Sequence, residues 1–173
     1  GFGHGELQPL WTSVPYGIAF AHNGNLTNYQ ELTEEITKQD SRYLNTNSDT
    51  EVLLHLFADK LHEHKPPESS EEFFELLCGA VGTIFKKVKG AYSVTAMIIG
   101  KGLVVFRDPN GIRPLVKGER SNGNGGKDFI FASENSMFYS LGYKPKGTVL
   151  PGELIYVNNE GQVFNKRLVK KDF

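Results

Sequence analysis

The residues best suited to chemistry in this sequence are Asn23 and Gly24, which follow an apolar segment at residues 16–21. That segment is predicted to be a buried strand. Residues 29–36 carry apolar side chains at helical spacing, so we expect Asn23 and Gly24 to lie where a strand ends and the chain turns toward a helix. The side-chain amide of Asn23 and the backbone N–H of Gly24 are two donors that can converge, as an oxyanion hole for acyl transfer requires.

The same two residues also have a purely structural interpretation. Asn-Gly is the commonest sequence of a two-residue β-hairpin turn. A helix, not a second strand, is expected after the pair, which weakens the hairpin interpretation without establishing catalysis. From the residues alone, both interpretations stay open.

Two of the predicted helices begin at sequences typical of capping boxes. Asn28 is expected to cap the first helix, with Glu31 completing the box. The run from Ser48 to Glu51 fits the Ser-x-x-Glu box of a second helix. Within that run, Asp49 is an acidic residue in the first helical turn, where the helix macrodipole favours negative charge. On these grounds alone, Asp49 needs no function beyond starting the helix.

A third helix is predicted after the proline-containing break at residues 65–67. Ser70 is its expected N-cap, and an apolar stripe runs from Phe73 to Val88. The one cysteine of the chain, Cys78, lies in this stripe. We predict that it is a packing residue, because buried cysteine behaves as a small hydrophobic side chain.

From Gly90 onward the apolar spacing changes from helical to strand-like. Strands are predicted at residues 91–99, 103–107, 129–132, 151–157 and 162–168, with a short helix at 134–141. The run from Asp108 to Pro114 is predicted to be structural, turning one core strand into the next, and is given no catalytic role. Helices first and strands later favour an α+β fold with largely antiparallel sheets.

The composition is that of an ordinary globular domain. The 173 residues are 39% hydrophobic and 23% charged, with a formal net charge of −1, so nothing indicates nucleic acid or a membrane surface as a partner. No apolar run is long enough to cross a bilayer. The five histidines are scattered, so no metal site is predicted. A single cysteine excludes an internal disulfide and fits a reducing compartment, so we expect a cytoplasmic protein.

Five stretches occur in an order typical of one family: AHNGNLTN at 21–28, TNSDTE at 46–51, GAYS at 90–93, FRDPNGIRPL at 106–115 and ASE at 132–134. Together they resemble the glutaminase domain of amidophosphoribosyltransferases, from about Glu6 to the C-terminal hairpin. The Asn-Gly, Ser-Asp and Arg-Asp-x-x-Gly-x-Arg-Pro elements are broader and are similar to other class II amidotransferases such as asparagine synthetase. The sequence around Asn23 and Asp108 is most similar to the purine enzymes.

The resemblance implies an N-terminal-nucleophile hydrolase fold, an αββα sandwich of two antiparallel sheets between helix layers, here expected to be incomplete at its N-terminus. It implies that glutamine is hydrolysed and that ammonia passes to a phosphoribosyltransferase domain of the same polypeptide, which makes phosphoribosylamine from phosphoribosyl pyrophosphate. By motif matching, Asn23 and Gly24 would stabilise the tetrahedral oxyanion. Asp49 would accept a charge-assisted hydrogen bond from the α-ammonium of glutamine. The resemblance also implies no cofactor in this domain, Mg²⁺ in the phosphoribosyltransferase domain, and a homo-oligomeric parent enzyme.

The sequence departs from the family at the nucleophile, which in the family is an N-terminal cysteine whose own α-amino group is the base. Position 1 is Gly1. Cys78 cannot substitute, because it lies in a helix stripe and has no free amine. We therefore expect residues 1–173 to be a partial, inactive domain. The nucleophile segment, the arginine that the family uses on the substrate carboxylate and the phosphoribosyltransferase domain are expected to lie outside them.

Two further hypotheses stay open beside this one. The chain can belong to another class II amidotransferase of the asparagine synthetase type, or it can be a non-catalytic binding module of the same fold. Intact Asn23, Gly24 and Asp49 favour a catalytic parent. The upstream gene sequence would discriminate, because only a catalytic parent needs a cysteine exposed at its processed N-terminus.

Overall fold

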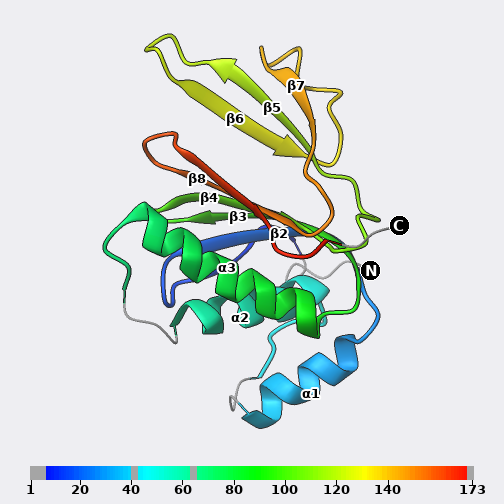
Figure 1. Ribbon diagram of the computed structural model, residues 1–173. Helices are drawn as coiled ribbons and strands as arrows, with labels where there is room; N and C mark the ends of the chain where they lie inside the picture. The colour runs from blue at the N-terminus through cyan, green and yellow to red at the C-terminus, as the bar shows by residue number, and fades with distance from the viewer. Residues whose placement is uncertain (1–6, 40–42, 63–65, 171–173) are drawn as a thin grey trace.

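The computed structural model describes residues 7–39, 43–62 and 66–170. The helices are α1 (Tyr29–Gln39), α2 (Asp49–His62) and α3 (Ser70–Lys87). Helices α2 and α3 lie against one face of a six-stranded sheet, α1 lies beyond α2, and a three-stranded sheet lies over the other face (Figure 1). Within the described ranges, no helix is long and apolar enough to cross a membrane.

Every strand pairing in the two sheets is antiparallel. The larger sheet has the order β1-β2-β3-β4-β8-β9, formed by Leu10–Thr12, Ile18–Leu26, Gly90–Ile98, Gly102–Arg107, Glu153–Asn158 and Val163–Arg167. The smaller sheet has the order β6-β5-β7, formed by Lys127–Ala132, Val116–Ser121 and Lys144–Thr148. The α+β class and the two stacked antiparallel sheets predicted from the sequence are therefore confirmed.

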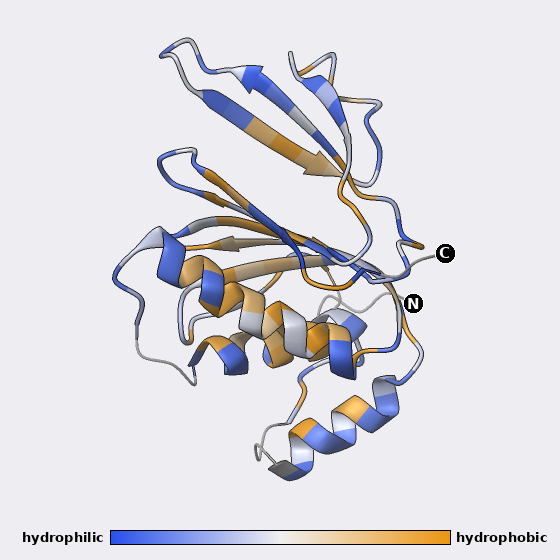
Figure 2. Ribbon diagram, in the orientation of Figure 1, coloured by the Kyte–Doolittle hydropathy of each residue, from blue (hydrophilic) through white to orange (hydrophobic). Residues whose placement is uncertain are grey.

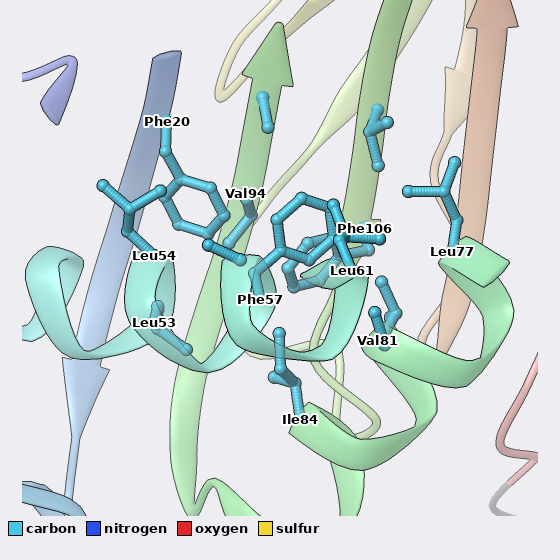
Figure 3. Packing of buried hydrophobic residues seen from close by; sticks show 14 of the residues in the cluster. Phe20, Leu53, Leu54, Phe57, Leu61, Leu77, Val81, Ile84, Val94 and Phe106 are labelled. Atoms are coloured by element: carbon cyan, nitrogen blue, oxygen red, sulfur yellow. The ribbon is translucent and has the colours of Figure 1, made fainter. Parts of the chain in front are cut away.

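The main core lies between the helices and the six-stranded sheet, because alternate residues of each central strand point to that side. On β3 the predicted alternation is confirmed by three buried residues, Val94, Ala96 and Ile98. Figure 3 shows side chains of α2 and α3 meeting those of β2, β3 and β4. The ring of Phe57 on α2 lies 5.8 Å from that of Phe20 and 6.1 Å from that of Phe106. These centroid distances are typical of attractive aromatic pairs.

A smaller core fills the space between the two sheets and consists of Val105, Leu115, Val149, Ile155 and Val157. Phe129 and Phe131 of β6 pack against it. Accordingly, Figure 2 shows the three-stranded sheet as largely hydrophilic along β5 and β7 but apolar toward the end of β6. This core holds the end of β6 over the six-stranded sheet.

The N-terminus of α3 lies one residue earlier than predicted. Its N-cap is Ser69, whose Oγ accepts a hydrogen bond from the Glu72 N–H at 3.1 Å. The predicted cap, Ser70, is the first helical residue, and its Oγ accepts from Nδ2 of Asn158 at 3.0 Å. Two adjacent serines are equally good caps by type, and the tertiary contact of Ser70 decides between them.

Asn28 does not form the capping box that was predicted at the start of α1. Its Nδ2 donates to the carbonyl of Lys87 at 3.0 Å, and its Oδ1 accepts from the N–H of Lys89 at 2.9 Å. Asn28 therefore joins the start of α1 to the connection between α3 and β3. Glu31 lies within 3.9 Å of the Lys89 ammonium, a surface ion pair.

The capping box predicted at α2 is confirmed for Ser48 and is wrong for Glu51. Ser48 caps the helix, since its Oγ accepts from the Thr50 N–H at 3.2 Å. Glu51 does not return to Ser48. Its carboxylate accepts from the backbone N–H and the side chain of both Asn45 and Thr46, at 2.7–3.1 Å. Buried Glu51 thus fixes the loop that precedes α2.

In the C-terminal half, one predicted helix is wrong and the strand β7 (Lys144–Thr148) was missed. Residues 134–141 form turns and no helix, with Phe138 buried between exposed Met137 and Tyr139. The strand β7 was not predicted, because its sequence, KPKGT, contains Pro145 and Gly147, which weaken a strand signal. An edge strand tolerates proline, and β7 is at an edge of its sheet.

Candidate active site

Asn23 and Gly24 lie inside β2 and not at its end. The ladder with β3 continues through the pairs Asn23↔Ser93 and Gly24↔Tyr92 as far as Leu26. The predicted strand end before Asn23 is therefore wrong, and so is the hairpin interpretation. The strand is longer than its apolar run indicates, because β3, more than sixty residues further along the chain, supplies the pairing.

Gly24 is required by its close contact with β3. Its φ is +144°, and a Cβ at this position would lie 1.9 Å from the carbonyl oxygen of Ala91. A side chain there would collide with backbone, which cannot move aside as a flexible side chain can. Glycine removes both the collision and the backbone strain.

The N–H groups of alternate β2 residues point to the strand edge opposite β3. The Thr27 N–H donates to the Lys89 carbonyl and the Gly17 carbonyl accepts from the Ile99 N–H, so the odd-numbered residues form the hydrogen bonds with β3. By alternation, the N–H groups of His22, Gly24 and Leu26 point the other way. The His22 N–H donates to Oε1 of Gln8 at 2.6 Å. The Leu26 N–H donates to Oδ2 of Asp49 at 2.7 Å. The Gly24 N–H lies between these two bonds and points to the same edge.

Asp49 joins α2 to β2. It is the first residue of α2, as predicted, and its bond to Leu26 reaches the end of the strand that carries Asn23. One of the two carboxylate oxygens is therefore engaged by the strand. The carboxylate still lies in a cavity of about 400 Å³, which is lined by Gln8, His22, Asn23, Gly24, Asn25, Asn47, Ser48, Asp49 and Thr50.

All three residues predicted to form the site thus line one cavity, although Asn23 and Asp49 come from different elements. A second cavity of about 150 Å³ shares His22 and Asn23 and extends between the sheets toward Ser93, Leu115 and Ser133. The Asn23 side chain reaches this side, and its Nδ2 donates to Oγ of Ser133 at 3.0 Å. The Asn23 side-chain amide therefore lies on the face of β2 toward the second sheet, one residue before the Gly24 N–H at the strand edge.

His22 is a residue of the site that sequence reasoning missed. It is 8% exposed and its Nδ1 lies 3.4 Å from Oγ1 of Thr50. Its Nε2 is buried, and no described residue offers it a hydrogen bond. Burial lowers the pKa of His22 from 6.5 to about 4, with Arg113 adding to the effect and Asp49 opposing it. The imidazole is therefore neutral at physiological pH. Side chains alternate along a strand, so a side chain next to Asn23 could have been expected to point to the opposite face, toward α2.

We expect His22 to make the stability of the domain fall with acid. Its folded pKa lies below its unfolded value, so the stabilisation is complete above pH 6.5 and is lost as the pH falls toward 4. Between pH 7 and pH 5 the loss should be about 2 kcal/mol in the free energy of unfolding. Unfolding of wild type and His22→Gln at both pH values would measure it. The matched control is His62→Gln, at the exposed end of α2. An identical pH dependence in wild type and His22→Gln would contradict the prediction.

Cys78 is buried on α3, as predicted. Burial is the main cause that raises the pKa of its thiol to about 11, and Glu75 raises it further against the opposing effect of Lys166. A thiol is nucleophilic as the thiolate, so this residue is unreactive at neutral pH.

The fold and the site define a class. Two stacked antiparallel sheets packed against a helix layer, with the Asn23 side chain between the sheets, are an N-terminal-nucleophile hydrolase fold. The chain belongs to the glutamine amidotransferase domain family, whose sequence profile matches residues 3–140. The resemblance noted in the sequence is thereby confirmed.

Relatives of known identity agree. The amidophosphoribosyltransferase of Escherichia coli K12 is 43% identical over 164 residues, which cover 94% of this chain and 32% of the relative. That of Saccharomyces cerevisiae is 39% identical, over 88% of this chain and 29% of the relative. The chain thus spans about a third of the length of these relatives.

Solved structures give the same result. The glutamine phosphoribosylpyrophosphate amidotransferase of B. subtilis, complexed with ADP and GMP, superposes with a TM-score of 0.75 at 29% identity, covering 98% of this chain and 33% of that one. A class-II glutamine aminotransferase domain protein of Silicibacter pomeroyi, 17% identical with a TM-score of 0.53, shares the fold.

Proposed function

We propose that this chain is the glutaminase part of an amidophosphoribosyltransferase, a glycosyltransferase of purine biosynthesis in the cytoplasm. The observation that carries the proposal is the meeting of Asn23, Gly24 and Asp49 at one cavity in a chain of this family. Glutamine is the proposed substrate, and its side-chain amide is the bond broken. Water is consumed, and glutamate and ammonia are released.

The site residues act at the two ends of glutamine, the side-chain amide and the α-ammonium. A nucleophile outside the described residues attacks the amide carbon, and the carbonyl oxygen becomes an oxyanion. The Asn23 amide and the Gly24 N–H donate to that oxyanion, which stabilises the transition state. Asp49 accepts from the α-ammonium at the other end of the substrate. Its bond to Leu26 fixes the carboxylate relative to Gly24, two residues earlier on the strand.

The remaining partners are proposed from the family resemblance. We propose that ammonia passes to a phosphoribosyltransferase domain of the same polypeptide, which uses phosphoribosyl pyrophosphate and holds Mg²⁺. No cofactor is proposed for the glutaminase part, and the complete enzyme is proposed to be a homo-oligomer. The test is the complete polypeptide assayed for glutamate release and for phosphoribosylamine formation with glutamine or with an ammonium salt. Failure to release glutamate would favour the non-catalytic module.

Residues 1–173 on their own are expected to hydrolyse no glutamine. Their single thiol, Cys78, is buried and held protonated, and an oxyanion hole without a nucleophile supplies only part of the rate. Glutamate release should equal the background, and Cys78→Ala should not change it. Activity in the purified chain that Cys78→Ala abolishes would refute both this expectation and the packing role of Cys78.

A further inference from the structure

The Asn23 amide is held by a residue from the other sheet. Nδ2 of Asn23 donates to Oγ of Ser133 at 3.0 Å, a contact between residues 110 positions apart in the sequence. Ser133 directly follows β6, whose last residue, Ala132, pairs with Val116 of β5. The two side chains line the same cavity of about 150 Å³. The hydrogen bond therefore crosses from the six-stranded to the three-stranded sheet beside the proposed oxyanion site.

Such a contact matters because an exposed asparagine amide is otherwise free to turn. The last torsion of an asparagine side chain is broad, with no sharp staggered minima. Asn23 is exposed on its strand, so neighbouring side chains do not fix the amide plane by packing. An oxyanion donor stabilises a transition state best when it is oriented before the reaction.

The chemistry of the amide nitrogen allows both contacts at once. Nδ2 carries two hydrogens. When one is donated to Ser133, the amide plane is fixed and the second hydrogen stays available to an oxyanion. Ser133 in turn is held in place by β6, because Phe131, two residues earlier, packs against the core between the sheets.

We propose that Ser133 is a positioning residue for glutamine hydrolysis, which orients the Asn23 amide so that its second N–H meets the oxyanion. The inference rests on the proposed function and adds to it a residue of the second sheet. Ser133 does not itself touch the reacting atoms. Its effect on the reaction is transmitted wholly through Asn23.

Kinetics of the complete polypeptide test the proposal. Ser133→Ala should lower kcat for glutamine about 2- to 15-fold, the range of one hydrogen bond, and leave KM nearly unchanged. Phosphoribosylamine formation from an ammonium salt should be unaffected, and Ser133→Thr, which keeps the hydroxyl, should restore most of kcat. The matched control is Ser136→Ala, an exposed serine three residues further on whose Oγ donates to Glu134.

A double-mutant cycle separates positioning from general structural loss. In an Asn23→Ala background, Ser133→Ala should have no further effect, because the group that it orients is gone. The same fold-loss in both backgrounds would overturn the proposal, as would equal loss with glutamine and ammonium or a change confined to KM.

Crystal structures of the complete polypeptide, wild type and Ser133→Ala, provide a readout that does not depend on turnover. The Asn23 amide should be ordered on Ser133 in the wild type and turned or disordered in the variant. The same amide orientation in both would overturn the positioning role. Absent glutaminase activity in a wild type with an ordered amide would instead count against the proposed function.

Discussion

Replacing Asn23 with alanine in the complete polypeptide is expected to lower kcat for glutamine by about 10²–10³-fold, with little change in KM. The side-chain amide meets negative charge that exists only in the transition state, so its loss affects turnover and not ground-state binding. The Gly24 N–H, fixed in the strand, would remain as the second donor. This explains why the expected loss is that of one donor and not of the whole site.

Steady-state assays with glutamine and with an ammonium salt would measure the effect. Ammonium-dependent synthesis should be retained, because ammonia needs no amide hydrolysis. Asn159→Ala, in the exposed turn between β8 and β9, is a control for asparagine removal elsewhere on the domain. An unchanged kcat in Asn23→Ala would show that Asn23 serves only the β2–β3 ladder.

Asp49→Asn is expected to weaken the use of glutamine by about 1.5–3 kcal/mol in kcat/KM, the value of a lost hydrogen bond to a charged group. The structure makes this substitution informative, because an asparagine side-chain oxygen can still accept from the Leu26 N–H. The hydrogen bond that connects α2 to β2 is then kept while the negative charge is removed. Ammonium-dependent synthesis should survive.

The outcomes distinguish the two interpretations of Asp49. Selective loss with glutamine supports recognition of the α-ammonium. No loss with either nitrogen source would leave only the helix-start role, which is worth about 0.3–1 kcal/mol of stability. Equal loss of activity with glutamine and with ammonium would indicate that the substitution had disrupted the contact between β2 and α2. Asp49→Ala, which removes the acceptor as well as the charge, gives the reference for such a disruption.

Much of the fold was predictable because its signals are local. The helical stripe from Phe73 to Val88 and the alternation on β3 are periodic patterns, and each burial face follows from them. Cys78 was placed correctly for the same reason. The capping errors share a cause, which is that these residues take partners that a capping pattern does not contain. Asn28 and Ser70 bond to residues more than fifty positions away, and Glu51 bonds to the loop that precedes its own helix.

In the candidate site, too, local signals were predictable and contacts between separate elements were not. Residue types and the family resemblance identified Asn23, Gly24 and Asp49, but not that the pair lies within a strand. That required the pairing of β2 with β3. The Asp49 bond to Leu26 and the Asn23 bond to Ser133 depend on how separate elements meet in space. No spacing along the chain encodes them.

The bonds along the β2 edge also decide what shape of molecule can dock there. A peptide adding to a strand edge uses the N–H of every second residue in turn. At this edge the His22 and Leu26 groups are already occupied by the side chains of Gln8 and Asp49. Among the described residues, the Gly24 N–H alone is left of the three donors that strand addition at this edge would use. The edge is thereby protected against edge-to-edge aggregation. Under the proposed function, this edge offers a donor to a single oxygen atom, such as that of the side-chain amide of free glutamine, and is poorly suited to the addition of an extended peptide strand.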